Sequence, residues 1–250
     1  MSVDERMVHD IVQKVMANMQ ISGSVSGMHG VFKDMNDAIN ASIEAQKKVC
    51  TMTLDQREQI ISLIRKKTHE NAEILANMGV NETGMGNVGD KILKHHLTAD
   101  KVPGTEDIST IAWSGDRGLT LVEMGPFGVI GAITPATNPS ETVICNCIGM
   151  LAGGNTVVFN PHPNAKKTTI YTINMINEAS IEAGGPDNIA VTVEAPTLDT
   201  SAIMMKHPSI HLLVATGGPG VVTAVLSSGK RAIGAGAGNP PVLVLSLIHI

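Results

Sequence analysis

Residues 128–142, which read GVIGAITPATNPSET, decide the fold. A short apolar run rich in β-branched residues passes into a loop stiffened by prolines, and helical spacing begins near residue 140. The same succession recurs along the second half of the chain. The other short runs are LTLVEM, NTVVFN, IAVTV, HLLVAT and PVLVLSL, and segments with helical spacing cover 140–151, 165–183, 198–206 and 219–228. Strands that alternate with helices predict right-handed βαβ crossovers and a largely parallel sheet flanked by helices.

A helical region precedes this α/β pattern. From Val31 to about His96 the apolar residues recur at steps of three and four among Lys, Glu and Gln. Asp34 or Asn36 is the candidate cap of the first helix, and Thr53 of the second. The expected domain, residues 31–244, is therefore α/β with helices at its start.

Residues 1–20 form a separate unit in the sequence. Their apolar positions predict one stripe of an amphipathic helix, and the Gly- and Ser-rich residues 21–30, ISGSVSGMHG, predict a flexible linker. Two interpretations stay open. The helix packs on its own domain, or it is a detachable docking helix that buries its stripe against a partner.

Composition excludes several classes of protein. The 250 residues carry 18 basic and 23 acidic side chains, a formal net charge of −5, and no block of five or more like charges, which argues against nucleic-acid binding. No apolar run reaches the roughly 18 residues of a membrane span. Three cysteines without a CxxC pair predict free thiols, and the nine histidines show no metal-binding spacing, so we expect no metal.

Ligands of open parallel sheets bind beyond the carboxyl ends of the strands, so the candidate site lies in the loops there. These loops are 133–141, 159–167, 215–220 and 234–241. In the third, ATGGPG leads into a helix, whose N-terminal N–H groups favour an anion such as phosphate. A Gly-rich turn without a ligand is the alternative, and the GxGxxG fingerprint of ordinary dinucleotide folds is not satisfied.

Other candidate residues each have a structural alternative. The prolines around Thr137 and Asn138 fix a hydroxyl and a carboxamide, which suits an oxyanion donor or simply a rigid turn. Ser140 with Glu141 is a helix cap more often than a catalytic pair. His162 is a base or a loop filler. His95 and His96 are expected to be solvated, and Cys145 and Cys147 to be inert residues of a buried helix.

Five segments together resemble the CoA-acylating aldehyde dehydrogenases, in particular the propionaldehyde and acetaldehyde dehydrogenases of bacterial microcompartments. They are NETGMG (81–86), PFGVIGAITPATNPSET (126–142), PHPNAKK (161–167), ATGGPGVV (215–222) and GAGAGNPP (234–241). The resemblance runs from about Val31 to Val244. Residues 1–30 also resemble the encapsulation peptides of that group. The resemblance implies an aldehyde dehydrogenase-like NAD-binding domain and a parent enzyme that is a homo-oligomer. It also implies a cytoplasmic location in the microcompartment lumen, where residues 1–20 would contact the shell or other cargo.

The reaction that the resemblance implies is oxidation of propionaldehyde or acetaldehyde by NAD through a cysteine thioester, with coenzyme A as co-substrate and acyl acceptor. Thr137 or Asn138 would be the oxyanion donor, and the chemistry favours Asn138. The cofactor-binding residues would be Thr134, Pro135 and Ala136 on the nicotinamide side, Asn160, Pro161 and His162 at the adenosine ribose, and Thr216, Gly217, Gly218, Gly220 and Val221 at the pyrophosphate.

Three departures from ordinary aldehyde dehydrogenases matter. The ribose-binding lysine of the hydrolytic enzymes is replaced by Asn160 and their water-activating glutamate by Ala235, and without that base a thioester should persist until CoA attacks. After PPVLV the family continues with an acidic stretch and reaches its nucleophilic cysteine a few dozen residues later, whereas this chain instead reads LSLIHI. We therefore expect an inactive fragment with an atypical tail, residues 245–250. Two rivals remain: a non-catalytic cargo or scaffold protein, and an NAD enzyme that uses Cys145 or Cys147.

Overall fold

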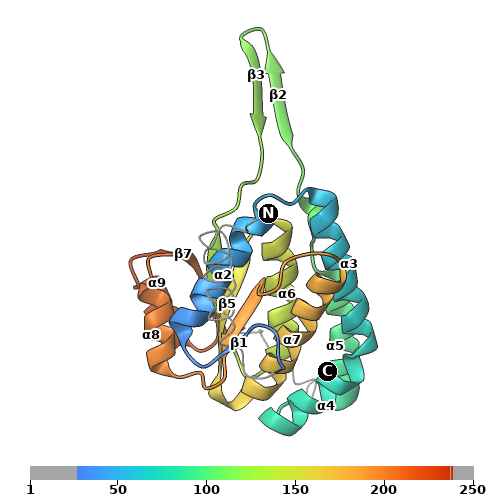
Figure 1. Cartoon of the computed structure of the whole chain (residues 1–250), viewed down its shortest axis with the longest axis vertical. Coiled ribbons are helices and arrows are strands. Elements are labelled where there is room, and N and C mark those ends of the chain that lie inside the picture. The colour runs from blue at the N-terminus through green and yellow to red at the C-terminus, as the bar shows by residue number, and fades with distance from the viewer. Residues whose placement is uncertain (1–26, 237, 239–250) are drawn as a thin grey trace, which may run out of the picture.

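A six-stranded parallel sheet forms the centre of the molecule (Figure 1). The computed structural model describes residues 27–236 and 238. Every pair of neighbouring strands in this sheet is parallel, and the order is β1-β6-β5-β4-β7-β8. The strands are β1 (Val31–Phe32), β4 (Val129–Thr134), β5 (Thr156–Pro161), β6 (Ala190–Val193), β7 (Ile210–Thr216) and β8 (Arg231–Ala235). The predicted α/β fold is confirmed.

Helices cover both faces of the sheet (Figure 1). One face packs against α2 (Met35–Val49), α8 (Leu198–Lys206) and α9 (Pro219–Leu226). The other packs against α6 (Pro139–Ala152) and α7 (Lys166–Glu182), which are covered in turn by α3 (Leu54–Glu70), α4 (Ala72–Thr83) and α5 (Val88–Lys101). Short 3₁₀ turns follow α5 (η1, Thr105–Asp107) and β5 (η2, Pro163–Ala165). The predicted helices at 140–151, 165–183, 198–206 and 219–228 correspond to α6, α7, α8 and α9.

The sheet separates two aliphatic cores. Helix α6 shows how the sequence builds the larger one, because its buried residues recur at steps of three and four: Val143, Ile144, Cys147, Ile148 and Leu151. Strands β5 and β6 are buried on both faces, which favours apolar runs such as VVF in place of alternation. In AVTV of β6 the buried Thr192 hydroxyl donates to the Phe159 carbonyl at 3.0 Å.

The region predicted to be helical from Val31 onward begins with a short strand instead of a helix. Val31 and Phe32 form strand β1, which pairs with β6, so the first helix begins only at Met35. Asp34 caps it by accepting hydrogen bonds from the Asn36 and Asp37 amides, and Thr53 caps α3 in a capping box with Gln56. A strand of two residues has no period of its own, so only its sheet neighbour reveals it.

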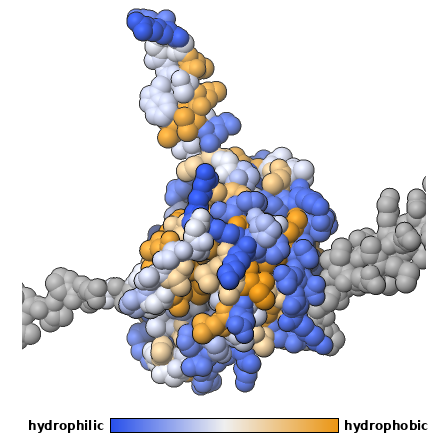
Figure 2. Space-filling view, turned by 90° about the vertical axis from the view of Figure 1, so that its left-hand side faces the viewer, coloured by the Kyte–Doolittle hydropathy of each residue, from blue (hydrophilic) through white to orange (hydrophobic). Residues whose placement is uncertain are grey.

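Two further strands form a separate two-stranded sheet. LTLVEM contributes β3 (Gly118–Val122), which pairs antiparallel with an unpredicted strand, β2 (Ile111–Gly115). Both strands are exposed along their length, and Figure 2 shows the hairpin standing away from the body with apolar side chains along it and a hydrophilic tip. Strand β8 was also not predicted, since its residues overlap the start of the expected 234–241 loop.

Several expectations fall outside the described residues: the helix at 1–20, most of the linker, the PVLVLSL strand and the tail 245–250. Within residues 27–236 and 238, no helix is long and apolar enough to cross a membrane. The last residues of the expected linker are described, and they are anchored: the His29 amide donates to Asn174 Oδ1 at 2.8 Å, and His29 Nδ1 lies 2.9 Å from Asp187 Oδ2.

Gly30 joins this anchored turn to β1, and its conformation requires glycine. Its φ is +75°, and a Cβ there would lie 2.4 Å from the Ala190 carbonyl oxygen and 2.3 Å from Asn177 Nδ2. The carbonyl of Gly30 also accepts from the Thr192 amide at 2.8 Å, which starts the β1–β6 ladder. The two atoms that the Cβ would meet are hydrogen-bonded to each other, since Asn177 Nδ2 donates to the Ala190 carbonyl at 2.7 Å, and this carbonyl belongs to the backbone of the buried strand β6.

We predict that Gly30→Ala destabilises the chain by about 3 kcal/mol or more, because a strained φ of about 1 kcal/mol is added to a clash in a close-packed core. Urea unfolding measures the free energy. Gly229→Ala is the matched control, since Gly229 has φ +79° and open space around the added Cβ, so it carries only the backbone cost. Equal losses in the two variants would contradict the clash.

Candidate functional site

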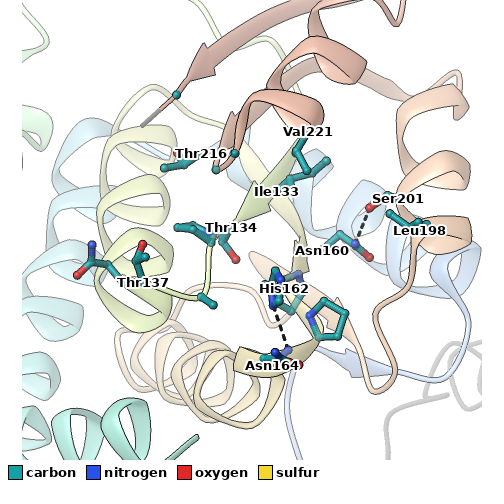
Figure 3. A pocket seen from close by; sticks show the side chains of 18 of the residues that line it. Ile133, Thr134, Thr137, Asn160, His162, Asn164, Leu198, Ser201, Thr216 and Val221 are labelled. Carbon is teal, nitrogen blue, oxygen red and sulfur yellow. Dashed lines mark hydrogen bonds between the residues drawn. The ribbon is translucent and has the colours of Figure 1, made fainter. Parts of the chain in front are cut away.

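The strand register brings three loops to one edge of the sheet. Thr134 of β4 pairs with Pro161 of β5, and Ile133 pairs with Ala215 of β7, so these three strands end at nearly the same level. The loops that follow them surround a cavity of about 890 Å³ (Figure 3). Its position beyond the carboxyl ends of parallel strands is where this class of sheet binds ligands.

Nearly all the sequence-predicted site residues line this cavity. They are Thr134, Pro135, Ala136, Thr137, Asn138, Asn160, Pro161, His162, Thr216, Gly217, Gly218 and Val221. Gly220 does not line it and lies in the first turn of α9. Sequence reasoning missed one wall, formed by Thr197, Leu198 and Ser201 at the start of α8. The rest of the lining comes from the expected loops 133–141, 159–167 and 234–241, although its residues were not singled out: Ile133, Pro163, Asn164, Gly236 and Gly238. The loop before α8, residues 194–197 (EAPT), has one proline and no glycine, so it does not stand out in the sequence and only the fold shows that it borders the cavity.

Helix α9 presents a free N-terminus to the cavity. Its N-cap residue is Gly218, no side chain caps it, and Pro219 occupies the first turn. A Cβ added at Gly217, Gly218 or Gly220 would meet no atom within 4 Å, so packing inside the described chain does not explain these glycines. They leave the backbone open to close approach by a ligand, and the helix end favours a negative one.

Asn160 lies on the opposite side of the cavity, where its carboxamide is held by α8. Its Nδ2 donates to Ser201 Oγ at 2.6 Å (Figure 3), and its Oδ1 accepts from Thr200 Oγ1 at 2.7 Å. Both ends of the amide are therefore used within the protein. Asn160 shapes the wall and fixes α8 against the sheet, and it has no free amide pointed at a ligand.

Two more polar groups face the same space. The Thr134 hydroxyl is buried and has no hydrogen-bond partner in the described chain, so a bound ligand could supply the missing hydrogen bond. The His162 backbone amide donates to the Thr134 carbonyl at 3.0 Å, which extends the β4–β5 ladder into the loop, while its Nδ1 accepts from the Asn164 amide at 3.2 Å. His162 is thus a fixed part of the loop whose ring borders the cavity (Figure 3).

The loop of Thr137 and Asn138 is held from α5. Lys91 Nζ donates to the Thr137 carbonyl at 3.0 Å and lies 3.2 Å from Glu141 Oε1, and Lys94 Nζ donates to Asn138 Oδ1 at 3.3 Å. Lys91 is only 3% exposed and Glu141 6%. A charge so deeply buried requires both an ion partner and further hydrogen bonds, and here each is present.

His95, expected to be solvated, is fully buried beside this ion pair. Its Nδ1 lies 2.7 Å from the Lys91 carbonyl and its Nε2 2.7 Å from Ser140 Oγ, which in turn is 3.2 Å from Glu141 Oε2. Burial lowers the pKa of His95, so the ring is neutral, and the carbonyl beside Nδ1 places its proton there. Ser140 and Glu141 are therefore members of a buried network, and neither caps α6: its N-cap residue is Asn138, which makes no side-chain capping bond.

The described cysteines stand apart from the cavity. None of the three lines it. Complete burial raises the pKa of Cys147 to about 12, and burial also raises the pKa of Cys145, so both thiols resist forming the nucleophilic thiolate. Cys50 is exposed at the C-terminus of α2.

Charge around the cavity is unusually low for a polar site. None of its described lining residues is Asp, Glu, Lys or Arg. Across the described part of the chain, no group of three His, Cys, Asp or Glu side chains is arranged to hold a metal ion. The chemistry available there is hydrogen bonding from hydroxyls, carboxamides, the His162 imidazole and backbone N–H groups, and the N-termini of α6, α8 and α9 all border the cavity.

Comparison with known proteins identifies this architecture. The model of the aldehyde dehydrogenase family matches residues 17–247. The chain is a member of the aldehyde dehydrogenase family. It is 46% identical to an acetylating acetaldehyde dehydrogenase of Bilophila wadsworthia, over 96% of this chain and 51% of the relative. It is also 46% identical to a CoA-propanoylating propanal dehydrogenase of Salmonella typhimurium, over 86% of this chain and 46% of the relative. The chain thus spans about half the length of these curated relatives.

Solved structures agree. A propionaldehyde dehydrogenase from the Clostridium phytofermentans fucose utilisation bacterial microcompartment has a TM-score of 0.84 and 74% identity, over 85% of this chain and 49% of that protein. A Rhodopseudomonas palustris propionaldehyde dehydrogenase with bound propionyl-CoA has a TM-score of 0.83 and 50% identity, over 85% and 47%. The resemblance to CoA-acylating enzymes, inferred from five sequence segments, is confirmed.

The cysteine environments predict which thiols react. At pH 7.5, iodoacetamide should label the exposed Cys50 quickly and Cys147 only after unfolding, because a thiol with a pKa near 12 holds on the order of one thiolate in 10⁴ or fewer. Cys145, which is partly buried and whose pKa burial also raises, should react slowly in the folded chain. Peptide mass spectrometry over time measures each rate, with Cys50→Ser as the control that should remain nearly unlabelled. Rapid labelling of Cys145 in the folded chain would instead favour it as a nucleophile.

Proposed function

We propose that this chain is the NAD-binding half of a CoA-acylating aldehyde dehydrogenase that converts a short aliphatic aldehyde, propionaldehyde or acetaldehyde, with NAD and CoA into acyl-CoA and NADH. The observation that carries the proposal is the open, uncapped N-terminus of α9 at the strand edge, in a chain whose relatives are named acylating dehydrogenases. One relative of known structure has bound propionyl-CoA, and another, an engineered glycolyl-CoA reductase, has bound NADP⁺.

The cavity residues fit a dinucleotide. Gly217 and Gly218 leave room for a pyrophosphate against the N–H groups of α9, and Thr216 and Val221 border it. The unpartnered Thr134 hydroxyl, with Pro135 and Ala136, lines the part where the nicotinamide would lie. Pro161 and His162 form the wall for the ribose. When bound there, NAD supplies the hydride acceptor, and the residues of this chain orient it.

The residue at the end of β8 favours CoA over water as the acyl acceptor. Ala235, which pairs with Thr216, occupies the place of the water-activating glutamate of hydrolytic relatives, so this strand end supplies no carboxylate to activate water. An acyl thioester held nearby would survive until the CoA thiol attacks. Asn138, on the loop beside the cavity, supplies a hydrogen bond to the developing oxyanion.

The nucleophile is proposed to come from the half of the enzyme that this chain does not contain. The argument is chemical: Cys147 is a buried thiol and Cys145 a partly buried one, burial raises both pKa values, and the described cavity lining includes no cysteine. The 250-residue chain should therefore bind NAD and not turn over aldehyde.

We predict that NADH forms from propionaldehyde, NAD and CoA only in a protein that also carries the native C-terminal half. The absorbance of NADH measures the rate. Omitting CoA should reduce the reaction to a burst of about one NADH per site, because the thioester is not hydrolysed. Turnover by the 250-residue chain would contradict the placement of the nucleophile, and sustained turnover without CoA would contradict acyl transfer.

We further propose that residues 1–20 direct the enzyme into a bacterial microcompartment, as an amphipathic helix on a Gly- and Ser-rich linker suits a detachable docking element. Fused to a fluorescent protein, residues 1–30 should give punctate fluorescence in cells that assemble microcompartments. Replacing Ile11 and Val15 with Asp should make it diffuse by breaking the apolar stripe, and Asp10→Asn, off that stripe, should not. Diffuse fluorescence of the unaltered fusion would contradict the proposal.

A further inference from the structure

Two lysines on one turn of α5 donate hydrogen bonds to the Thr137–Asn138 loop from outside the cavity. Lys91 and Lys94, three residues apart on α5, fall on neighbouring positions of the helix surface. Lys91 Nζ reaches the Thr137 carbonyl at 3.0 Å, and Lys94 Nζ reaches Asn138 Oδ1 at 3.3 Å. Neither lysine lines the cavity, whereas both of their targets do.

The contact at Thr137 fixes the backbone. The chain contains no cis peptide bond among the described residues, and in a planar trans peptide the carbonyl of one residue and the N–H of the next point in opposite directions. By holding the Thr137 carbonyl, Lys91 therefore also fixes the direction of the Asn138 N–H. The buried pairing with Glu141 keeps the Lys91 ammonium in place, since an unpaired charge at that depth would be very unfavourable.

The contact at Asn138 fixes the side chain. An ammonium is a hydrogen-bond donor only, so it selects the carboxamide oxygen and turns the Nδ2 amino group the other way. Withdrawal of electrons toward the bound oxygen also makes the Nδ2 hydrogens stronger donors. Orientation and donor strength are the two properties that an oxyanion donor needs before the reaction begins.

We propose that Lys91 and Lys94 are positioning residues for the oxyanion donor: Lys91 sets the peptide plane at Thr137–Asn138, and Lys94 sets and polarises the Asn138 carboxamide. This rests on the proposed function, in which Asn138 faces the reacting aldehyde. Lys94 carries the test, because it is exposed and its removal leaves no buried charge, whereas Lys91 is part of a buried ion pair.

The first readout needs no catalysis. In the 250-residue chain labelled with ¹⁵N-asparagine, the Asn138 side-chain signals are identified by their loss in Asn138→Ala. Lys94→Met should shift and broaden these signals and leave those of other asparagines in place. Lys101→Met, an exposed lysine further along α5, is the matched control and should leave the Asn138 signals unchanged.

The second readout is kinetic, in the protein that carries both halves. Lys94→Met should lower kcat about 10-fold with the KM for NAD unchanged, and Lys94→Arg should restore most of the rate, since it keeps a donor at the same oxygen. Unchanged Asn138 signals, or shifted signals with unchanged kcat, would overturn the proposal. A parent protein that forms no NADH would instead contradict the proposed function, while the Asn138 signals would still report whether Lys94 holds the carboxamide.

Discussion

The register of β4 against β5 and β7 is the constraint on which the rest of the molecule depends. Thr134, Pro161 and Thr216 end their strands at one edge only because Thr134 pairs with Pro161 and Ile133 with Ala215. Strands β4 and β5 are buried on both faces and β7 buries one face in a core, so a one-residue slip would turn core side chains to the wrong face as well as misplace the loops. The same packing that stabilises the sheet therefore assembles the cavity.

A second constraint lies behind the cavity, in the polar network between α5 and α6. Lys91, Glu141, Ser140 and His95 are all nearly inaccessible, and a buried ion pair of this kind contributes little net stability compared with apolar residues of similar size. Such a network specifies position instead. It ties the start of α6 to α5 and thereby holds Thr137 and Asn138, the part of the site where the proposed chemistry needs the most accurate placement.

The sequence predicts the fold and most of the cavity lining because both follow local rules. The positions of α6 to α9 follow from the spacing of apolar residues, and Gly- and Pro-rich loops at strand ends identify most of the lining from Thr134 to Val221. What it misses depends on distant contacts. His95 sits on a helix of ordinary amphipathic pattern, and only its approach to Ser140, 45 residues later, shows that it is buried. The α8 wall, strand β1 and the hydrogen bonds of Lys91 and Lys94 to the Thr137–Asn138 loop were missed for the same reason: each depends on contacts between residues far apart in the sequence.

The most direct test of the central claim, that the strand-edge cavity holds NAD, is a map of backbone amide shifts in the ¹⁵N-labelled chain titrated with NAD. We expect the largest shifts at Thr134, Ala136 and Thr137, at His162, and at Gly217, Gly218, Gly220 and Val221, all at or just beyond the carboxyl ends of β4, β5 and β7. Saturating shifts elsewhere, on the exposed faces of α3 to α5 or on the β2–β3 hairpin, would contradict this placement, as would no shift at millimolar NAD.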